Sequence, residues 1–121
     1  MKRILLAEDE VVLSEPISDL LTALFPVEVL VAQDGAEAIK MAQEYLPDLI
    51  LMDLNLPRID GWEATRSLRQ YAAFENTPIL AISAHAMAEE RQRALQAGCN
   101  AFYSKPIDID EFIEFIRPYL T

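Results

Sequence analysis

Five short apolar runs recur along the chain, and each is followed by a longer stretch with helical character. The apolar runs are Ile4–Ala7, Val27–Ala32, Leu49–Met52, Ile79–Ile82 and Ala101–Tyr103. Nearly continuous apolar runs of this length are typical of strands that are buried on both faces, as in a parallel sheet. The alternation of strand and helix patterns therefore predicts one α/β domain over residues 1–121, built as a doubly wound sheet of five parallel strands.

Two of the intervening stretches show helical spacing most clearly. Apolar residues recur every three or four positions within Leu13–Leu24 and again within Ile109–Ile116. Pro16 falls inside the first pattern. This helix therefore either begins late, with Ser14 as its cap and Pro16 in its first turn, or is kinked at the proline.

The glycines mark further helix boundaries. Asp34-Gly35 and Asp60-Gly61 are expected to open the second and third helices, and Gly98 is expected to end the fourth. That fourth helix has few large apolar residues to anchor it. It is either a weakly held, movable element or an ordinary exposed helix.

Composition narrows the possible functions. The chain has 20 acidic residues against 10 Lys and Arg, for a net charge of −10, yet 52% of its residues are hydrophobic. So large an apolar fraction excludes a disordered acidic chain. The negative charge argues against direct binding of nucleic acid or of an anionic membrane. It favours instead a cation, a basic partner or a site built from carboxylates.

Two further features concern the compartment. The single cysteine, Cys99, cannot form an internal disulfide. The apolar run near the N-terminus is too short for a signal peptide or a membrane span. Both features predict a cytoplasmic protein.

Candidate chemistry gathers where the predicted strands end. In an open α/β sheet, ligands bind beyond the carboxyl ends of the strands. The polar residues that follow the first, third, fourth and fifth strands are Glu8, Asp9, Glu10, Asp53, Asn55, Ser83 and Lys105. These strand ends bring together carboxylates, a hydroxyl and an ammonium, and we expect them to form one site.

The three carboxylates Glu8, Asp9 and Asp53 would repel one another in such a site. At about 4 Å and an effective dielectric of about 20, each pair of like charges costs roughly 4 kcal/mol. Either one carboxyl group stays protonated or a divalent cation is bound, and oxygen ligands suit Mg²⁺. With Lys105 and Ser83 added, the set suits transfer of a phosphoryl group to an aspartate.

The same residues carry a family resemblance. The segments are Glu8-Asp9, Met52–Pro57 with Asp60-Gly61, Ser83-Ala84 and Lys105-Pro106. In order and spacing, over essentially the whole chain, this set resembles the receiver (CheY-like) domain of two-component response regulators. The resemblance implies a flavodoxin-like (βα)5 fold with strand order 2-1-3-4-5.

The resemblance also implies roles for the site residues. Asp53 would be the phosphoacceptor. Glu8, Asp9 and Asp53, with the backbone carbonyl of Asn55, would bind Mg²⁺. Ser83 and Lys105 would contact the phosphoryl group, and the Lys105-Pro106 bond would be cis. Glu8 stands where the family more often has Asp, which could lengthen the metal contact.

Further roles concern signalling and timing. By resemblance, Ser83 and Phe102 would be the switch residues, whereas Asn55 and His85 would tune loss of the phosphoryl group. Phe102 could instead be an ordinary core aromatic residue. Its neighbour Tyr103 could present the aromatic surface in its place, or simply pack.

The implied function is a phosphoacceptor switch in a two-component system or phosphorelay. A sensor histidine kinase or histidine phosphotransfer protein would supply the phosphate. A downstream protein would read the face made by the fourth helix, fifth strand and fifth helix. The chain would be no enzyme beyond catalysing its own phosphorylation and dephosphorylation.

Alternative functions are a receiver module excised from a larger response regulator or hybrid kinase, and a phosphorylation-independent interaction module. A stand-alone protein is modestly favoured by the early first strand. A Mg²⁺-dependent phosphatase is disfavoured because Asn55 stands where such enzymes need a second carboxylate. A flavin-binding domain is disfavoured because the acidic residues after the first strand would repel its phosphate.

Overall fold

The computed structural model describes residues 1–85 and 87–120. Five parallel strands form one sheet in the order β2-β1-β3-β4-β5. The strands are β1 (Lys2–Ala7), β2 (Val27–Ala32), β3 (Leu49–Asp53), β4 (Ile79–Ser83) and β5 (Ala101–Ser104). The fold class and strand order expected from the sequence are confirmed, and each predicted apolar run lies within a strand.

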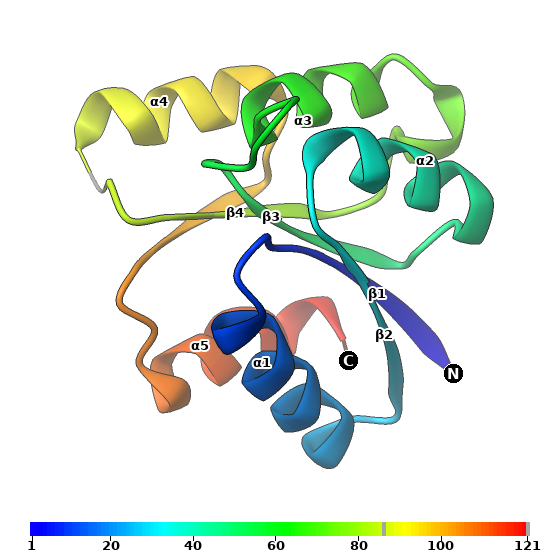
Figure 1. Ribbon diagram of the computed structural model, residues 1–121, viewed down its shortest axis with the longest axis vertical. Coiled ribbons are helices and arrows are strands. Elements are labelled where there is room, and N and C mark those ends of the chain that lie inside the picture. Colours follow the sequence, from blue (N-terminus) through cyan, green and yellow to red (C-terminus); the bar gives the residue numbers. More distant parts are fainter. Residues whose placement is uncertain (86, 121) are drawn as a thin grey trace.

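Five α-helices cover the two faces of this sheet. They are α1 (Val11–Leu24), α2 (Gly35–Tyr45), α3 (Gly61–Arg69), α4 (Ala88–Ala97) and α5 (Ile109–Ile116), with short 3-10 turns η1 (Ala72–Phe74) and η2 (Arg117–Tyr119). Helices α1 and α5 lie on one face, and α2, α3 and α4 lie on the other (Figure 1). No helix in the described part of the chain is long and apolar enough to cross a membrane.

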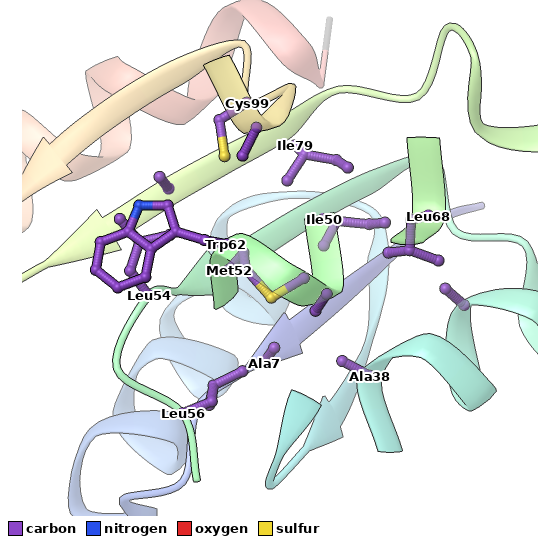
Figure 2. Packing of buried hydrophobic residues seen from close by; sticks show 14 of the residues in the cluster. Ala7, Ala38, Ile50, Met52, Leu54, Leu56, Trp62, Leu68, Ile79 and Cys99 are labelled. Atoms are coloured by element: carbon purple, nitrogen blue, oxygen red, sulfur yellow. The ribbon is translucent and has the colours of Figure 1, made fainter. Parts of the chain in front are cut away.

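The central strand β3 separates two hydrophobic cores. Successive strand residues point to opposite faces, so Ile50 and Met52 pack with α2, α3 and α4, whereas Leu49 and Leu51 pack with α1 and α5. Figure 2 shows part of the first core, with Trp62 at one end of it. Every residue of β3 is buried. The strand that ends at Asp53 is therefore packed on both faces by the two hydrophobic cores.

Helix α1 corrects one sequence-based expectation. It begins at Val11 with Glu10 as its cap, and it continues through Pro16. Ser14 is therefore not a cap but a buried residue inside the helix. A proline at this position lacks the N–H that would bond to the preceding turn, and its ring crowds the carbonyl of Val12 four residues earlier. Burial of Ile17 and Leu21 beneath the helix keeps the segment helical.

The expected helix boundaries at the aspartate and glycine residues are confirmed. The Asp34 and Asp60 side chains accept hydrogen bonds from the third backbone N–H of α2 and α3, at 2.7 and 2.9 Å. Gly98 ends α4 with a φ of 116°, in the left-handed region where glycine is the residue of least strain.

Arg69, at the end of α3, joins segments that are distant in sequence. Its guanidinium donates to the backbone carbonyls of Gly98, Phe74 and Thr77 and to the side chain of Asn100. Asn100 Oδ1 also accepts from the first N–H of β4, at 2.8 Å. Arg69 thus ties the end of α4 and the starts of β4 and β5 to α3.

Candidate functional site

Asp53 occupies the carboxyl end of the central strand. Asp53 is only 3% exposed. The backbone N–H of Asn55 donates to Oδ1 at 2.9 Å, and Lys105 Nζ donates to Oδ2 at 2.9 Å. Asn55 itself is exposed. Both carboxylate oxygens of Asp53 are therefore oriented by groups from two separate loops.

Glu8 and Asp9 follow β1, the strand beside β3, and they lie next to Asp53. One carboxylate oxygen from each of the three residues falls within 4.8 Å of the others. Glu8 is buried and Asp9 is exposed. Lys105 Nζ lies 3.2 Å from Glu8 Oε1. The ammonium therefore bridges the two buried carboxylates.

The electrostatics of this group follow from burial and charge. Burial, followed by the negative charge of Asp53, raises the pKa of Glu8 to about 7. Burial alone would lower the pKa of Lys105, but its hydrogen bond with Asp53 and the charges of Asp53 and Glu8 outweigh burial and raise it. Lys105 thus stays protonated, whereas Glu8 holds a proton well above its ordinary pH range.

The donor set fits a hard divalent cation. Three carboxylates contribute oxygen atoms close enough to reach one ion, and oxygen is the ligand that Mg²⁺ prefers. A cation with two positive charges would also offset the repulsion between Glu8 and Asp53, which adds to the effect of burial in raising the pKa of Glu8. The acidic cluster can therefore bind a metal ion at the end of β1 and β3.

Ser83 ends β4, one residue beyond Ile82, the register partner of Asp53. Its hydroxyl accepts a hydrogen bond from the backbone N–H of His85 at 3.0 Å. Its backbone carbonyl accepts from the N–H of Lys105 at 2.8 Å. Ser83 is fully buried, His85 is exposed, and the Lys105–Pro106 peptide bond is cis.

Phe102 and Tyr103 differ in their surroundings. Phe102 is half-buried on β5, and the guanidinium carbon of Arg91 lies 5.1 Å from the centre of its ring. Tyr103 is buried, and its hydroxyl donates to the carbonyl of Asp108 and accepts from the Asp108 N–H. Tyr103 therefore packs against the start of α5, which leaves Phe102 as the more accessible of the two aromatic residues.

Gly61 has a role at the site beyond the helix boundary that its position in the sequence predicts. A side-chain Cβ at this position would lie 2.4 Å from the carbonyl oxygen of Asp53 and 2.7 Å from the Cα of Leu54. The Gly61 N–H donates to the carbonyl of Leu54 at 3.1 Å. The missing side chain thus lets α3 begin directly against the backbone that carries Asp53.

Three arginine contacts were also missed, and that of Arg69 lies at the amino ends of β4 and β5, away from the site. Arg69, Arg91 and Arg93 all lie in or beside helices whose exposed faces are polar, and surface arginines at such positions carry no pattern that distinguishes them. Their partners come from other elements, so only the folded chain reveals them.

Comparison with known proteins agrees with this architecture. The family model described as response regulator receiver domain matches residues 4–117. The polar-differentiation response regulator DivK of Brucella anthropi is 38% identical over 98% of this chain and 96% of its own.

Two solved structures are similar. One is the receiver domain of sensor histidine kinase PA1611 from Pseudomonas aeruginosa, with a magnesium ion coordinated in its active site cleft. It has a TM-score of 0.89 and 34% identity, and the match covers 98% of this chain and 97% of that one. Vibrio cholerae chemotaxis protein CheY4 has a TM-score of 0.92 and 27% identity over 99% of each chain. The chain belongs to the response regulator receiver domain family.

Proposed function

We propose that this receiver domain is a phosphoacceptor switch, which takes a phosphoryl group onto Asp53 from the phosphohistidine of a sensor kinase or phosphotransfer protein. One observation carries the proposal: the buried Asp53 carboxylate is held at both oxygens, within reach of an ammonium and two further carboxylates. This arrangement presents a fixed nucleophile inside a charge environment suited to a phosphoryl group.

In the proposed reaction, one Asp53 carboxylate oxygen forms a bond to phosphorus. The bond from phosphorus to the donor's imidazole nitrogen breaks, and the nitrogen leaves with the bonding electron pair. Lys105, now paired with Asp53 and Glu8, transfers its hydrogen bond from the carboxylate to a phosphoryl oxygen. Ser83 can donate its hydroxyl hydrogen to another phosphoryl oxygen while it still accepts from the N–H of His85.

Glu8, Asp9 and Asp53, together with the backbone carbonyl of Asn55, would hold Mg²⁺ in this site. When bound, the ion supplies positive charge that offsets the charge of the phosphoryl oxygens. The chain's own residues orient the acceptor and exclude water, because Asp53, Glu8 and Ser83 are all buried. Exposed Asn55 and His85 stand at the rim, where they would affect how water reaches the acyl phosphate.

The proposed output is a change in the face made by α4, β5 and α5. Phosphorylation adds roughly −1.5 to −2 charges at the ends of β3 and β4. Ser83 and Phe102 would then move toward the phosphoryl group and shift the balance between two conformations. A downstream protein would read that shift. We propose no turnover of external substrates, and the cytoplasmic location and phosphorelay role remain predictions.

The proposal is tested by intact mass spectrometry with Mg²⁺ and acetyl phosphate. The wild type should gain one phosphoryl group that is stable to acid and labile to base, as expected for an acyl phosphate. Asp53→Asn should gain none, whereas Asp19→Asn, which removes an equal charge from the exposed surface of α1, should behave as the wild type.

Two results would contradict the proposal. Labelling of Asp53→Asn at the wild-type rate would place the acceptor elsewhere. A folded wild type that gains no mass with either acetyl phosphate or a phosphorylated histidine kinase would favour the phosphorylation-independent interaction module.

A further inference from the structure

Helix α4 is held on the domain by very little apolar surface. Its buried residues are two alanines, Ala94 and Ala97. Its cap residue Met87 and its one large apolar residue, Leu95, are exposed, at 70% and 47%. Two methyl groups bury too little area to orient a helix firmly, so other contacts must contribute to the position of α4.

Arg93 supplies one such contact on the α3 side. Its guanidinium carbon lies 4.0 Å from the centre of the Trp62 ring, well within the range of a cation–π interaction. Trp62 is 8% exposed, and its indole N–H has no hydrogen-bond partner among residues 1–85 and 87–120. Trp62 directly follows Gly61, which packs on the backbone of Asp53. Arg93 therefore connects α4 to a residue anchored beside the phosphoacceptor.

Arg91 supplies the second contact on the β5 side, above the Phe102 ring at 5.1 Å. Residues two apart on an α-helix point in directions about 200° apart. Arg91 and Arg93 therefore leave α4 on opposite sides, with Ala94 facing the sheet between them. The helix is held between two aromatic rings from two different elements.

We propose that Arg91 with Phe102 and Arg93 with Trp62 form an arginine clamp that positions α4 and opposes the phosphorylation-linked movement of Phe102. This inference rests on the proposed function. A movement of the Phe102 ring toward Ser83 separates the ring from Arg91 unless α4 moves with it. The clamp thus stabilises the conformation without phosphate, and its loss favours the phosphorylated one.

The clamp itself is tested without metal or phosphate. Hydrogen exchange of the α4 amides should be faster by roughly 2- to 5-fold in Arg93→Gln and in Arg91→Gln, as expected for partly exposed cation–π contacts. Arg66→Gln is the matched control, since it removes the same charge from an exposed ion pair on α3. Unchanged α4 exchange in both clamp variants would overturn the clamp.

The link to the switch is tested with beryllofluoride, a phosphoryl analogue, and Mg²⁺. Binding is followed by fluorescence of Trp62, the single tryptophan. Arg91→Gln should bind roughly 2- to 5-fold more tightly than the wild type, and Arg91→Lys, which keeps the charge, should return toward the wild-type affinity. General destabilisation would not tighten binding, so this gain separates a positioning role from a merely structural one.

Failure of the clamp and failure of the proposed function give different results. If Arg91→Gln binds beryllofluoride as tightly as the wild type or more weakly, the clamp does not oppose the movement of Phe102. A folded wild type that binds no analogue would contradict the proposed function and with it the link to Phe102. The hydrogen-exchange experiment tests the clamp independently of the proposed function, because it uses neither Mg²⁺ nor beryllofluoride.

Discussion

Lys105 Nζ lies 2.9 Å from Asp53 Oδ2, although 52 residues separate the two in sequence. The same ammonium lies 3.2 Å from Glu8 Oε1, across 97 residues. A single positive charge thus reaches both buried carboxylates at the ends of the two adjacent strands β1 and β3. This bridge holds Asp53 in position before any phosphoryl donor arrives, and it makes Lys105 the most informative residue to change.

Replacement of Lys105 by methionine should slow phosphorylation. Without the ammonium, charge on the phosphoryl oxygens loses one stabilising partner, and we expect the rate with acetyl phosphate and Mg²⁺ to fall by roughly 10²- to 10³-fold. Intact mass measured over time gives the rate. Lys40→Met, which removes an exposed charge on α2, serves as the control. A Lys105→Met protein labelled at the wild-type rate would show that the ammonium is dispensable.

The raised pKa of Glu8 predicts a pH-dependent stability of the metal-free protein. Between the ordinary value of 4.5 and about 7, folded Glu8 keeps a proton that the unfolded chain has lost. The stability that Glu8 contributes is therefore complete below pH 4.5 and is lost as the pH rises through 7. The loss is on the order of 3 kcal/mol.

Urea unfolding at several pH values, with Glu8→Gln as reference, isolates this contribution. The free energy of unfolding of the wild type should fall relative to that of the variant as the pH rises from 4.5 to 7, and the difference should level off above pH 7. Mg²⁺ affinity of the wild type should rise over the same window, because the ion and the proton compete for the carboxylate. A difference that is flat with pH would contradict the assigned pKa.

Substitution of Gly61 by alanine should damage both the fold and the site. The added Cβ would meet the backbone of Asp53 at 2.4 Å, and backbone atoms cannot rotate away as a flexible side chain can. We expect a loss of roughly 1–3 kcal/mol in the free energy of unfolding together with slower phosphorylation. Ser67→Ala, elsewhere on α3, is the control. Wild-type stability and labelling in Gly61→Ala would show that α3 shifts freely.

Removal of the Arg69 side chain should lower stability more than removal of an exposed arginine. Its guanidinium serves four oxygen acceptors from separate segments, and lost charge-assisted hydrogen bonds leave partly buried carbonyls unpaired. We expect Arg69→Ala to cost roughly 2–4 kcal/mol and Arg66→Ala less than about 1 kcal/mol. Urea denaturation measures both. Equal effects would show that the Arg69 contacts are replaced by water at little cost.

Much of the fold could be predicted because strand and helix signals are local. A parallel strand that is buried on both faces needs a short apolar run. Residues 49–52 of β3 form such a run, and every residue of the strand is buried. The helix caps at Asp34 and Asp60 depend on contacts only three residues away. Pro16 shows the limit of local reasoning: the sequence left a late start and a kink as alternatives, but burial of Ile17 and Leu21 kept the helix continuous from Val11.

The candidate site was foreseeable in its residues but not in its connections. The order of residues alone identifies which chemical groups follow each strand, and these groups gather because parallel strands bring their carboxyl ends to one edge. The bridge from Lys105 to Glu8 and Asp53, and the contact of Arg93 with Trp62, become visible only in the folded chain. Those contacts join residues from different elements, and their distances depend on how helices and loops pack together. That packing is a property of the whole folded chain, which no local pattern of residues encodes.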